Sequence, residues 1–377
     1  MNLRRTCAVS HKEFLHIMRD PRSLGMALAL PLLMIILFGY ALTLDVDRIP
    51  MVVYDASRTP GSRELIDAFR GSRYFKVVAW TDRYQTIEEY INKDQCLMGL
   101  VIQSTYTSDL LSGRGAEVQL ILDGSDSNTA SIARGYATAV MLTYNLRLLS
   151  DDLNRRSGGS YAPPVEGRLR IWYNSELKSR NYVVPGLIAL ILMIISALLT
   201  SLTIAREWEM GSMEQLLSTP VRATEIVLGK MSAFFVLGAV DTVLAVIAGV
   251  GIFKVPLRGS LLFLAATSCI FLIGALCWGI LISAVTRSQL VAYQLGMLSS
   301  FLPAFILSGF IFAIENMPAV IQGFTYIFPT RYFVSILKGI FLRGVGMKVL
   351  WFEVVLLSVY ATVVFLIAVR KLRQKVA

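Results

Sequence analysis

The chain has 377 residues, with 36 lysines and arginines against 26 acidic residues, and a formal net charge of +10 at pH 7. Hydrophobic residues make up 55% of it and charged residues 16%, and its mean hydropathy is +0.60. This composition excludes an ordinary soluble globular protein and predicts a membrane protein. Basic and acidic residues are equal in number between 45 and 180, so the net positive charge comes entirely from the rest of the chain, where basic residues flank the apolar runs. Positive charge spread in this way, instead of gathered in one polar domain, argues against a nucleic-acid partner.

Residues 1–23 are predicted to form a cytoplasmic, amphipathic connecting helix that leads into the first span. Its apolar face holds Cys7, Phe14, Leu15 and Met18. Its polar face holds Arg5, Lys12, His16 and Arg19. Such a helix is expected to lie along the inner leaflet and to contact membrane lipid, and Asp20 with Pro21 should end it.

Six apolar runs have about the 20 residues that a helix needs to cross a bilayer. They are 24–44, 183–204, 232–253, 261–285, 290–312 and 349–369. The first run is longer than the core of a signal peptide and follows an amphipathic segment, so we expect a retained anchor. The fold is therefore predicted to be an α-helical membrane protein, with one transmembrane helix at 24–44 and five more within 181–377.

The distribution of basic residues predicts the orientation of these spans. With the N-terminus inside, 13 lysines and arginines flank the spans on the cytoplasmic side, and the short outer loops hold only 6. Both termini are therefore expected in the cytoplasm, in a multi-pass protein of a bacterial cytoplasmic (inner) membrane.

Residues 45–180, between the first two spans, are predicted to form an extracytoplasmic α/β domain. Strands are expected at about 49–54, 75–80, 97–102 and 118–122, followed by a last strand at 169–173. Helices are expected at about 61–70, 83–93, 106–111 and 129–153, the last of them capped by Asp126 and Ser127. A flexible return is expected from Arg155 through Pro164.

A charged segment, 205–230, separates the second and third spans and is predicted to form a cytoplasmic hairpin of two short helices. Met210, Met213 and Leu217 share one stripe of a helix, and Glu207 and Glu214 share the next. Thr219 and Pro220 should end that helix and start the next one. One face is then apolar and the other acidic, as expected of a helix that binds a partner.

Asp241 is the single ionisable residue deep in a span. Its burial is expensive, so it is expected to face the bundle interior or an aqueous path. Two interpretations stay open: a carboxyl group hydrogen-bonded to a neighbour such as Thr242 or Tyr293, or a proton or cation relay.

The segment before the last span contains an apolar piece, 319–328, that is too short to cross a membrane. It is expected either to dip into the membrane and return or to lie on the outer leaflet. The nearby residues Gly309, Glu315, Asn316, Pro318 and Pro329 resemble the outer re-entrant region of the type-2 ABC exporter permeases, and this resemblance implies such a region at 313–348.

These features resemble the type-2 ABC exporter permeases, the ABC-2 family of membrane subunits, and most closely its drug-export members. The matching hairpin positions are Glu207, Glu209, Gly211, Glu214, Gln215, Leu216, Thr219, Pro220, Gly229 and Lys230. Ala205 and Ala313 depart from the family, which has an acidic residue at the first position and commonly a proline at the second.

The resemblance implies two six-span subunits, a homodimer or heterodimer, working with two separate ATPase subunits that bind ATP and Mg²⁺. Docking on the ATPase is expected to involve Glu207, Trp208, Glu209, Met210, Gly211, Met213, Glu214, Leu217, Thr219 and Pro220. The acidic side chains would pair with basic residues of the ATPase, and Met210, Met213 and Leu217 would supply packing. A periplasmic adaptor is a further partner left open.

No cofactor, metal or catalytic site is expected on this chain itself. Gly229 and Lys230 are followed by Met231 and lack the upstream glycine of a phosphate-binding loop. The run 111–115 superficially resembles an ABC signature but stands without that loop, so we interpret it as a turn. His11 and His16 are the only histidines, and their spacing does not suit a metal site.

The predicted function is therefore that of an export permease moving a drug-like or amphipathic substrate out of the cytoplasm. Two alternatives stay open. One is an ion-coupled secondary transporter using Asp241. The other is a membrane sensor with an outer ligand domain, which the absence of a cytoplasmic output domain disfavours.

Overall fold

The computed structural model describes residues 2–42, 48–112, 115–157, 173–174 and 178–376. The chain divides into two compact units. The membrane unit comprises 1–44 and 170–377, and the α/β unit comprises 45–169. The two units are described separately below.

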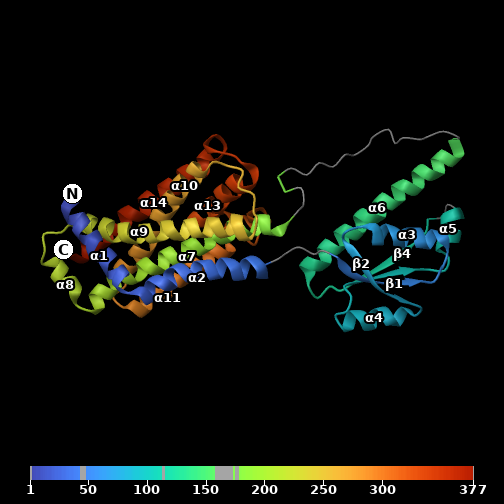
Figure 1. Ribbon diagram of the computed structural model, residues 1–377, viewed down its shortest axis with the longest axis horizontal. Helices are drawn as coiled ribbons and strands as arrows, with labels where there is room; N and C mark the ends of the chain where they lie inside the picture. The colour runs from blue at the N-terminus through green and yellow to red at the C-terminus, as the bar shows by residue number, and fades with distance from the viewer. Residues whose placement is uncertain (1, 43–47, 113–114, 158–172, 175–177, 377) are drawn as a thin grey trace. The chain divides into compact units, whose positions relative to one another are not determined.

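The membrane unit is helical (Figure 1). Its first four helices are α1 (Leu3–Arg19), α2 (Pro21–Ala41), α7 (Ser179–Glu209) and α8 (Ser212–Leu217). Its long later helices are α9 (Ala223–Ile247, continued by a π turn, Ala248–Ile252), α10 (Leu261–Val285), α11 (Gln289–Ile306) and α14 (Met347–Val376). Its short later helices are a 3-10 turn (Ile314–Asn316), α12 (Ala319–Thr325) and α13 (Pro329–Lys338, continued by a π turn, Gly339–Arg343).

Six helices in the described part of the chain are long and apolar enough to cross a membrane, in agreement with the predicted helical membrane fold. They are α2, α7, α9 with its π turn, α10, α11 and α14. The predicted fifth span extended to residue 312, but α11 ends at Ile306. Three residues later Gly309 adopts φ 75°, a left-handed conformation that favours glycine and turns the chain.

Helix α7 forms the centre of the membrane unit, and most residues of its apolar part are buried. A helix that is apolar all round is buried on all sides. Small residues let its neighbours approach closely. A Cβ atom on Gly279 of α10 would lie 2.3 Å from the Ala197 carbonyl oxygen, and one on Gly296 of α11 would lie 2.8 Å from Ser201 Oγ.

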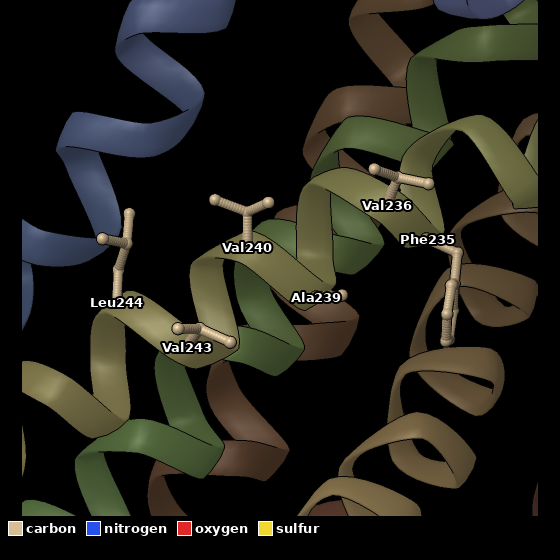
Figure 2. Close-up of a pocket in the computed structure, with 6 residues that line it drawn as sticks. All are labelled: Phe235, Val236, Ala239, Val240, Val243 and Leu244. Carbon is tan, nitrogen blue, oxygen red and sulfur yellow. The ribbon is translucent and has the colours of Figure 1, made fainter.

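Other apolar side chains of the spans face outward. Figure 2 shows such a face on α9, and its six labelled side chains come from this one helix: Phe235, Val236, Ala239, Val240, Val243 and Leu244. Val236 is 50% exposed and Val243 56%. Apolar exposure on this scale is expected where lipid surrounds a span, because apolar side chains there do not need protein neighbours.

The α/β unit contains one four-stranded sheet in the order β2-β1-β3-β4. Strands β1 (Ile49–Asp55), β2 (Phe75–Thr81) and β3 (Met98–Ile102) are parallel, and β4 (Val118–Leu122) is antiparallel to β3. The helices are α3 (Pro60–Gly71), α4 (Tyr84–Asn92), α5 (Tyr106–Ser112) and α6 (Ser127–Ser157).

Alternation along β1 explains the layers of this unit. Met51 and Val53 join the core under α3 and α6, whereas Val52 joins the separate core under α4. The four predicted strands and four predicted helices are confirmed to within a few residues. The last predicted strand, except for Tyr173, and most of the predicted flexible return lie outside the described residues.

Candidate functional site

The N-terminal helix α1 is docked on the start of α9. A Cβ atom on Gly229 would lie 2.7 Å from Val9 Cβ, so only glycine allows this approach. Beside it, the Ser232 hydroxyl donates to Ser10 Oγ at 2.8 Å. The docked stripe of α1 contains Val9 and is not its predicted apolar face.

The predicted apolar face of α1 is not covered by other parts of the described chain. Phe14 is 42% exposed and Met18 53%, and Arg19 is also exposed. Asp20 ends the helix as predicted. In the described part of the chain, α1 is thus docked on α9 through one stripe while its predicted apolar face stays exposed.

A buried network of charges joins α1 to both arms of the hairpin. Lys230 Nζ lies 2.7 Å from Glu13 Oε1 and 3.0 Å from Glu207 Oε1, and Lys12 Nζ lies 2.9 Å from Glu207 Oε1. Lys230 is 1% exposed, Glu13 7% and Glu207 8%. Burying a charge is unfavourable unless it has a partner. Separating α1, α7 and α9 would leave these charges without partners, so the network favours keeping the three helices together.

Lys12 occupies the outer position of the network, with 57% of its side chain exposed. Burial lowers the pKa of its ammonium group, but the hydrogen bond and charge of Glu207, together with the charge of Glu13, raise that pKa above its usual value. Lys12 therefore stays protonated at neutral pH and keeps its pair with Glu207.

The hairpin itself differs from the prediction in two respects. Pro220 does not start the second helix, because α9 starts at Ala223, with the Arg222 N–H donating to Glu225 Oε2 at 3.0 Å, and it continues as a long span instead of a short helix. The sequence predicted a single helix across Glu207 and Leu217, whereas α7 ends at Glu209 and α8 starts at Ser212. Gly211 lies between them at φ 72°, where a side chain would be strained. The predicted stripe is therefore broken: Met210 is 69% exposed and Met213 is fully buried.

Further contacts fix both ends of this hairpin. Met213 packs in a core cluster with residues of α7, α9, α10 and α14. The Arg287 guanidinium lies 5.2 Å from the centre of the Trp208 ring, and Glu209 Oε2 accepts the Gln289 backbone N–H at 2.9 Å.

The N-terminal residues of α1 also bond to the hairpin and to the start of α9. The Arg5 guanidinium donates to the Pro220 carbonyl, and the Asn2 N–H donates to Glu225 Oε1 at 2.6 Å. The Thr219 hydroxyl donates to the Leu216 carbonyl at 2.6 Å, which ends α8 where the sequence predicted a stop.

The ten predicted coupling residues differ in exposure. Trp208 is half-buried, and the side chain of Leu217 lies outside what the structure describes. Glu207 and Met213 are buried and hold the hairpin to the bundle. The exposed residues are Glu209, Met210, Gly211, Glu214, Thr219 and Pro220. Sequence reasoning missed Glu13 as a network residue, although Val9 and Glu13, four residues apart, mark a stripe distinct from the apolar face.

Asp241 faces the bundle interior, with 1% of the residue exposed. Its Oδ1 has no hydrogen-bond partner among the described residues. Thr242, one of the expected partners, instead donates to the Gly238 carbonyl at 2.7 Å. The structure therefore does not show the pairing expected with Thr242.

The segment before the last span consists of α12 and α13. Val320 of α12 is 86% exposed, whereas α13 is buried against α7, α10 and α14, and its 10 residues are too few to cross a bilayer. Pro318 and Pro329 start the two helices, and Glu315 and Asn316 lie in the preceding turn. The Gly309 carbonyl accepts from the Tyr182 hydroxyl at 3.1 Å and from Lys338 Nζ at 3.0 Å.

The described residues contain no cluster of three or more histidine, cysteine or acidic side chains that could hold a metal ion. The polar network at the hairpin consists of paired charges without a nucleophile poised beside a base. Its geometry suits mechanical linkage between helices.

Comparison with known families matches residues 21–370 to the family described as "ABC-2 family transporter protein". Over 348 residues the chain is 37% identical to the "Probable multidrug ABC transporter permease YbhS" of Escherichia coli (strain K12), covering 91% of this chain and 90% of that protein.

The permease YbhR of the same organism, with the same description, is 31% identical over 340 residues, or 90% of each chain. "ABC transporter G family member 20" of Dictyostelium discoideum is 25% identical over 384 residues, which cover 98% of this chain and 50% of that protein. With a family match across nearly the whole chain and relatives above 30% identity, the chain belongs to the ABC-2 transporter family, as a membrane-spanning permease subunit of an ABC exporter.

Proposed function

We propose that the exposed surface of the hairpin binds a separate ABC ATPase subunit and passes its movement to the spans. The observation that carries this proposal is the buried network: Glu207 and Lys230, at the two ends of the hairpin, are tied to each other and to α1. A hairpin joined in this way cannot tilt without moving α1, α7 and α9 together.

The docking surface combines an acidic and an apolar part. Glu214 and Met210 are exposed, and Gly211 lets the chain turn between them. Glu214 is suited to pair with a basic residue of the ATPase, and Met210 to enter an apolar pocket. Glu207, which the sequence assigned to docking, serves in this proposal as the internal anchor.

The experiment combines Met210→Glu with Glu214→Lys and measures ATP hydrolysis by the partner ATPase in the reconstituted complex. We expect stimulation by the permease to be lost, because one substitution places a charge in an apolar contact and the other reverses an attraction. Glu88→Lys, an exposed acidic residue of the α/β unit, serves as the matched control. Full stimulation in the double variant would refute the docking.

The same proposal assigns the remaining partners. Two ATPase subunits would carry ATP and Mg²⁺, and a second permease, identical or related, would complete the export path. Two distinct relatives in one organism are consistent with paired related subunits. The α/β unit would lie outside the cytoplasmic (inner) membrane, where a periplasmic adaptor could contact it, and both chain ends would lie inside.

The relatives described as multidrug permeases support a drug-like or amphipathic substrate. The exposed apolar face of α1 would lie on the inner leaflet, and α12 with α13 would enter the outer leaflet as a re-entrant pair. Cysteine accessibility in intact cells tests this orientation: a cysteine at Ser218 should react only after the membrane is permeabilised.

A further inference from the structure

A cavity of about 370 Å³ opens beside the buried charges of the hairpin. Helices α1, α2, α7 and α9 line it, with Ser212 of α8 at one side. One part of its wall is apolar and includes Leu24, Leu202 and Phe234. The other part contains the charge network, so the cavity has the polarity of an amphipathic molecule.

Glu207, which lines the polar part of this cavity, carries an unpaired acceptor. Glu207 Oε1 receives both Lys12 and Lys230, but Glu207 Oε2 is buried and has no hydrogen-bond partner among the described residues. Leaving a buried carboxylate oxygen without a donor is costly, and the cost is removed when a ligand supplies an N–H group.

The unpaired oxygen favours a head group that donates hydrogen bonds. The ammonium groups of Lys12 and Lys230 already contact Glu207 and Glu13, so an anionic head would compete with these carboxylates for them. A carboxylate or phosphate head can only accept and would leave Glu207 Oε2 without a donor, whereas an ammonium head carries N–H groups that can donate to it.

We propose that this cavity binds an amphiphile with an ammonium head, which donates to Glu207 Oε2 while the apolar tail lies against Leu202 and Phe234. Two sources share this chemistry. One is a phospholipid with an ethanolamine head, and the other is an ammonium-bearing amphiphile entering from the cytoplasm. The second source would be a candidate cargo, and that assignment rests on the transport role proposed above.

The test uses the full chain in phosphatidylcholine nanodiscs and dodecylamine carrying a photoreactive diazirine in its tail. Mass spectrometry of the labelled peptides should place the label on the segments that line the cavity, near Leu24, Leu202 and Phe234. Unlabelled dodecylamine should compete, and dodecanoate, with the same tail length and an anionic head, should not. Equal competition by dodecanoate would overturn the proposal, and this arm needs no variant.

A variant that fills the cavity tests whether the amphiphile binds at this position. Leu202→Trp should lower labelling roughly tenfold, because the apolar burial of a few carbons is worth about that factor. Leu198→Trp is the matched control, since Leu198 is equally half-buried on α7 but does not line the cavity. Unchanged labelling in Leu202→Trp, or an equal loss in Leu198→Trp, would contradict the site.

Nanodiscs containing phosphatidylethanolamine separate the two sources. Suppressed labelling with that lipid would support the site and assign it to the lipid head. Labelling that only dodecylamine suppresses would support the site and assign it to a soluble amphiphile. The measurement needs no ATPase, so a failure of hairpin docking would leave it unaffected.

Discussion

The ammonium group of Lys230 on α9 lies 2.7 Å from Glu13 Oε1 on α1, and only 1% and 9% of the two side chains are exposed. These residues are 217 positions apart in the sequence. The contact explains why a helix with an exposed apolar face stays attached to the bundle through its other side. It also identifies Lys230 as the residue on which the attachment depends.

Lys230→Met should strongly destabilise the membrane unit. The substitution leaves Glu13 without a partner, and removing one member of a buried pair costs about 3–5 kcal/mol. Thermal unfolding of the detergent-solubilised chain measures the loss as a lower Tm. Lys12→Met is the control, because an exposed pair contributes only about 0–1 kcal/mol. Equal losses in the two variants would show that the pair is not buried.

Adding Glu13→Gln to Lys230→Met should restore part of the lost stability. The double variant removes the uncompensated charge, so its loss should be smaller than the sum of the two single losses. The same unfolding measurement provides all four corners of the cycle. Strict additivity would mean that the two side chains do not interact.

Cysteines at Ser10 and Ser232 should form a disulfide under mild oxidation, because the two hydroxyl oxygens lie 2.8 Å apart. The background would lack the four native cysteines. A pair at Leu15 and Ser232 should not form, since Leu15 lies on the exposed side of α1. Gel mobility of the fragments after cleavage between the two positions reports both results.

Gly229→Ala should lower the yield of that disulfide, because the added Cβ would lie 2.7 Å from Val9. Gly25→Ala on α2 is the matched control, since nothing lies within 4 Å of its added Cβ. A yield in Gly229→Ala as high as in the control would mean that α1 and α9 are less closely docked than the structure shows.

Cys96 of the α/β unit should resist alkylation. It is 3% exposed, and burial, with a smaller contribution from the charge of Asp123, raises the pKa of its thiol. A raised pKa leaves less thiolate at any given pH, so the reaction should speed up only at alkaline pH. N-ethylmaleimide at neutral pH should modify exposed Cys7 and spare Cys96. Equal modification would contradict the described core.

Asp241→Asn should preserve export driven by the partner ATPase. The amide keeps the shape of the side chain, and in the proposed function hydrolysis on a separate subunit supplies the energy. Transport measured in vesicles with and without ATP distinguishes this account from ion coupling. Transport that continues without ATP and disappears in the variant would favour the ion-coupled alternative.

The sequence alone predicted the spans and the α/β unit well, because both depend on local periodicity. A short β-like run at 49–54, followed by a helical run, identified β1, and runs of about 20 apolar residues identified the membrane helices. The predicted end of the fifth span was wrong, because the apolar pattern continues past Ile306 whereas the backbone turns at Gly309. Backbone geometry at a glycine leaves little trace in hydropathy.

The arrangement of the candidate site was predictable only in part. The hairpin was located correctly, but Gly211 divides what helical spacing suggested was one helix. The sequence did not indicate the internal ion pairs of Glu207, because Lys12 is remote in the chain and Lys230 lies across the hairpin. Spacing on a single helix cannot reveal which charges a neighbouring helix covers.

In the proposed function, a separate ATPase binds the exposed surface of this hairpin. A photoreactive amino acid at Met210, which is 69% exposed, tests it directly in cells that also produce the ATPase. We expect a crosslink to the ATPase from position 210 and none from Val236 on the outward face of α9. A crosslink from position 236 alone, or from neither position in an active transporter, would contradict it.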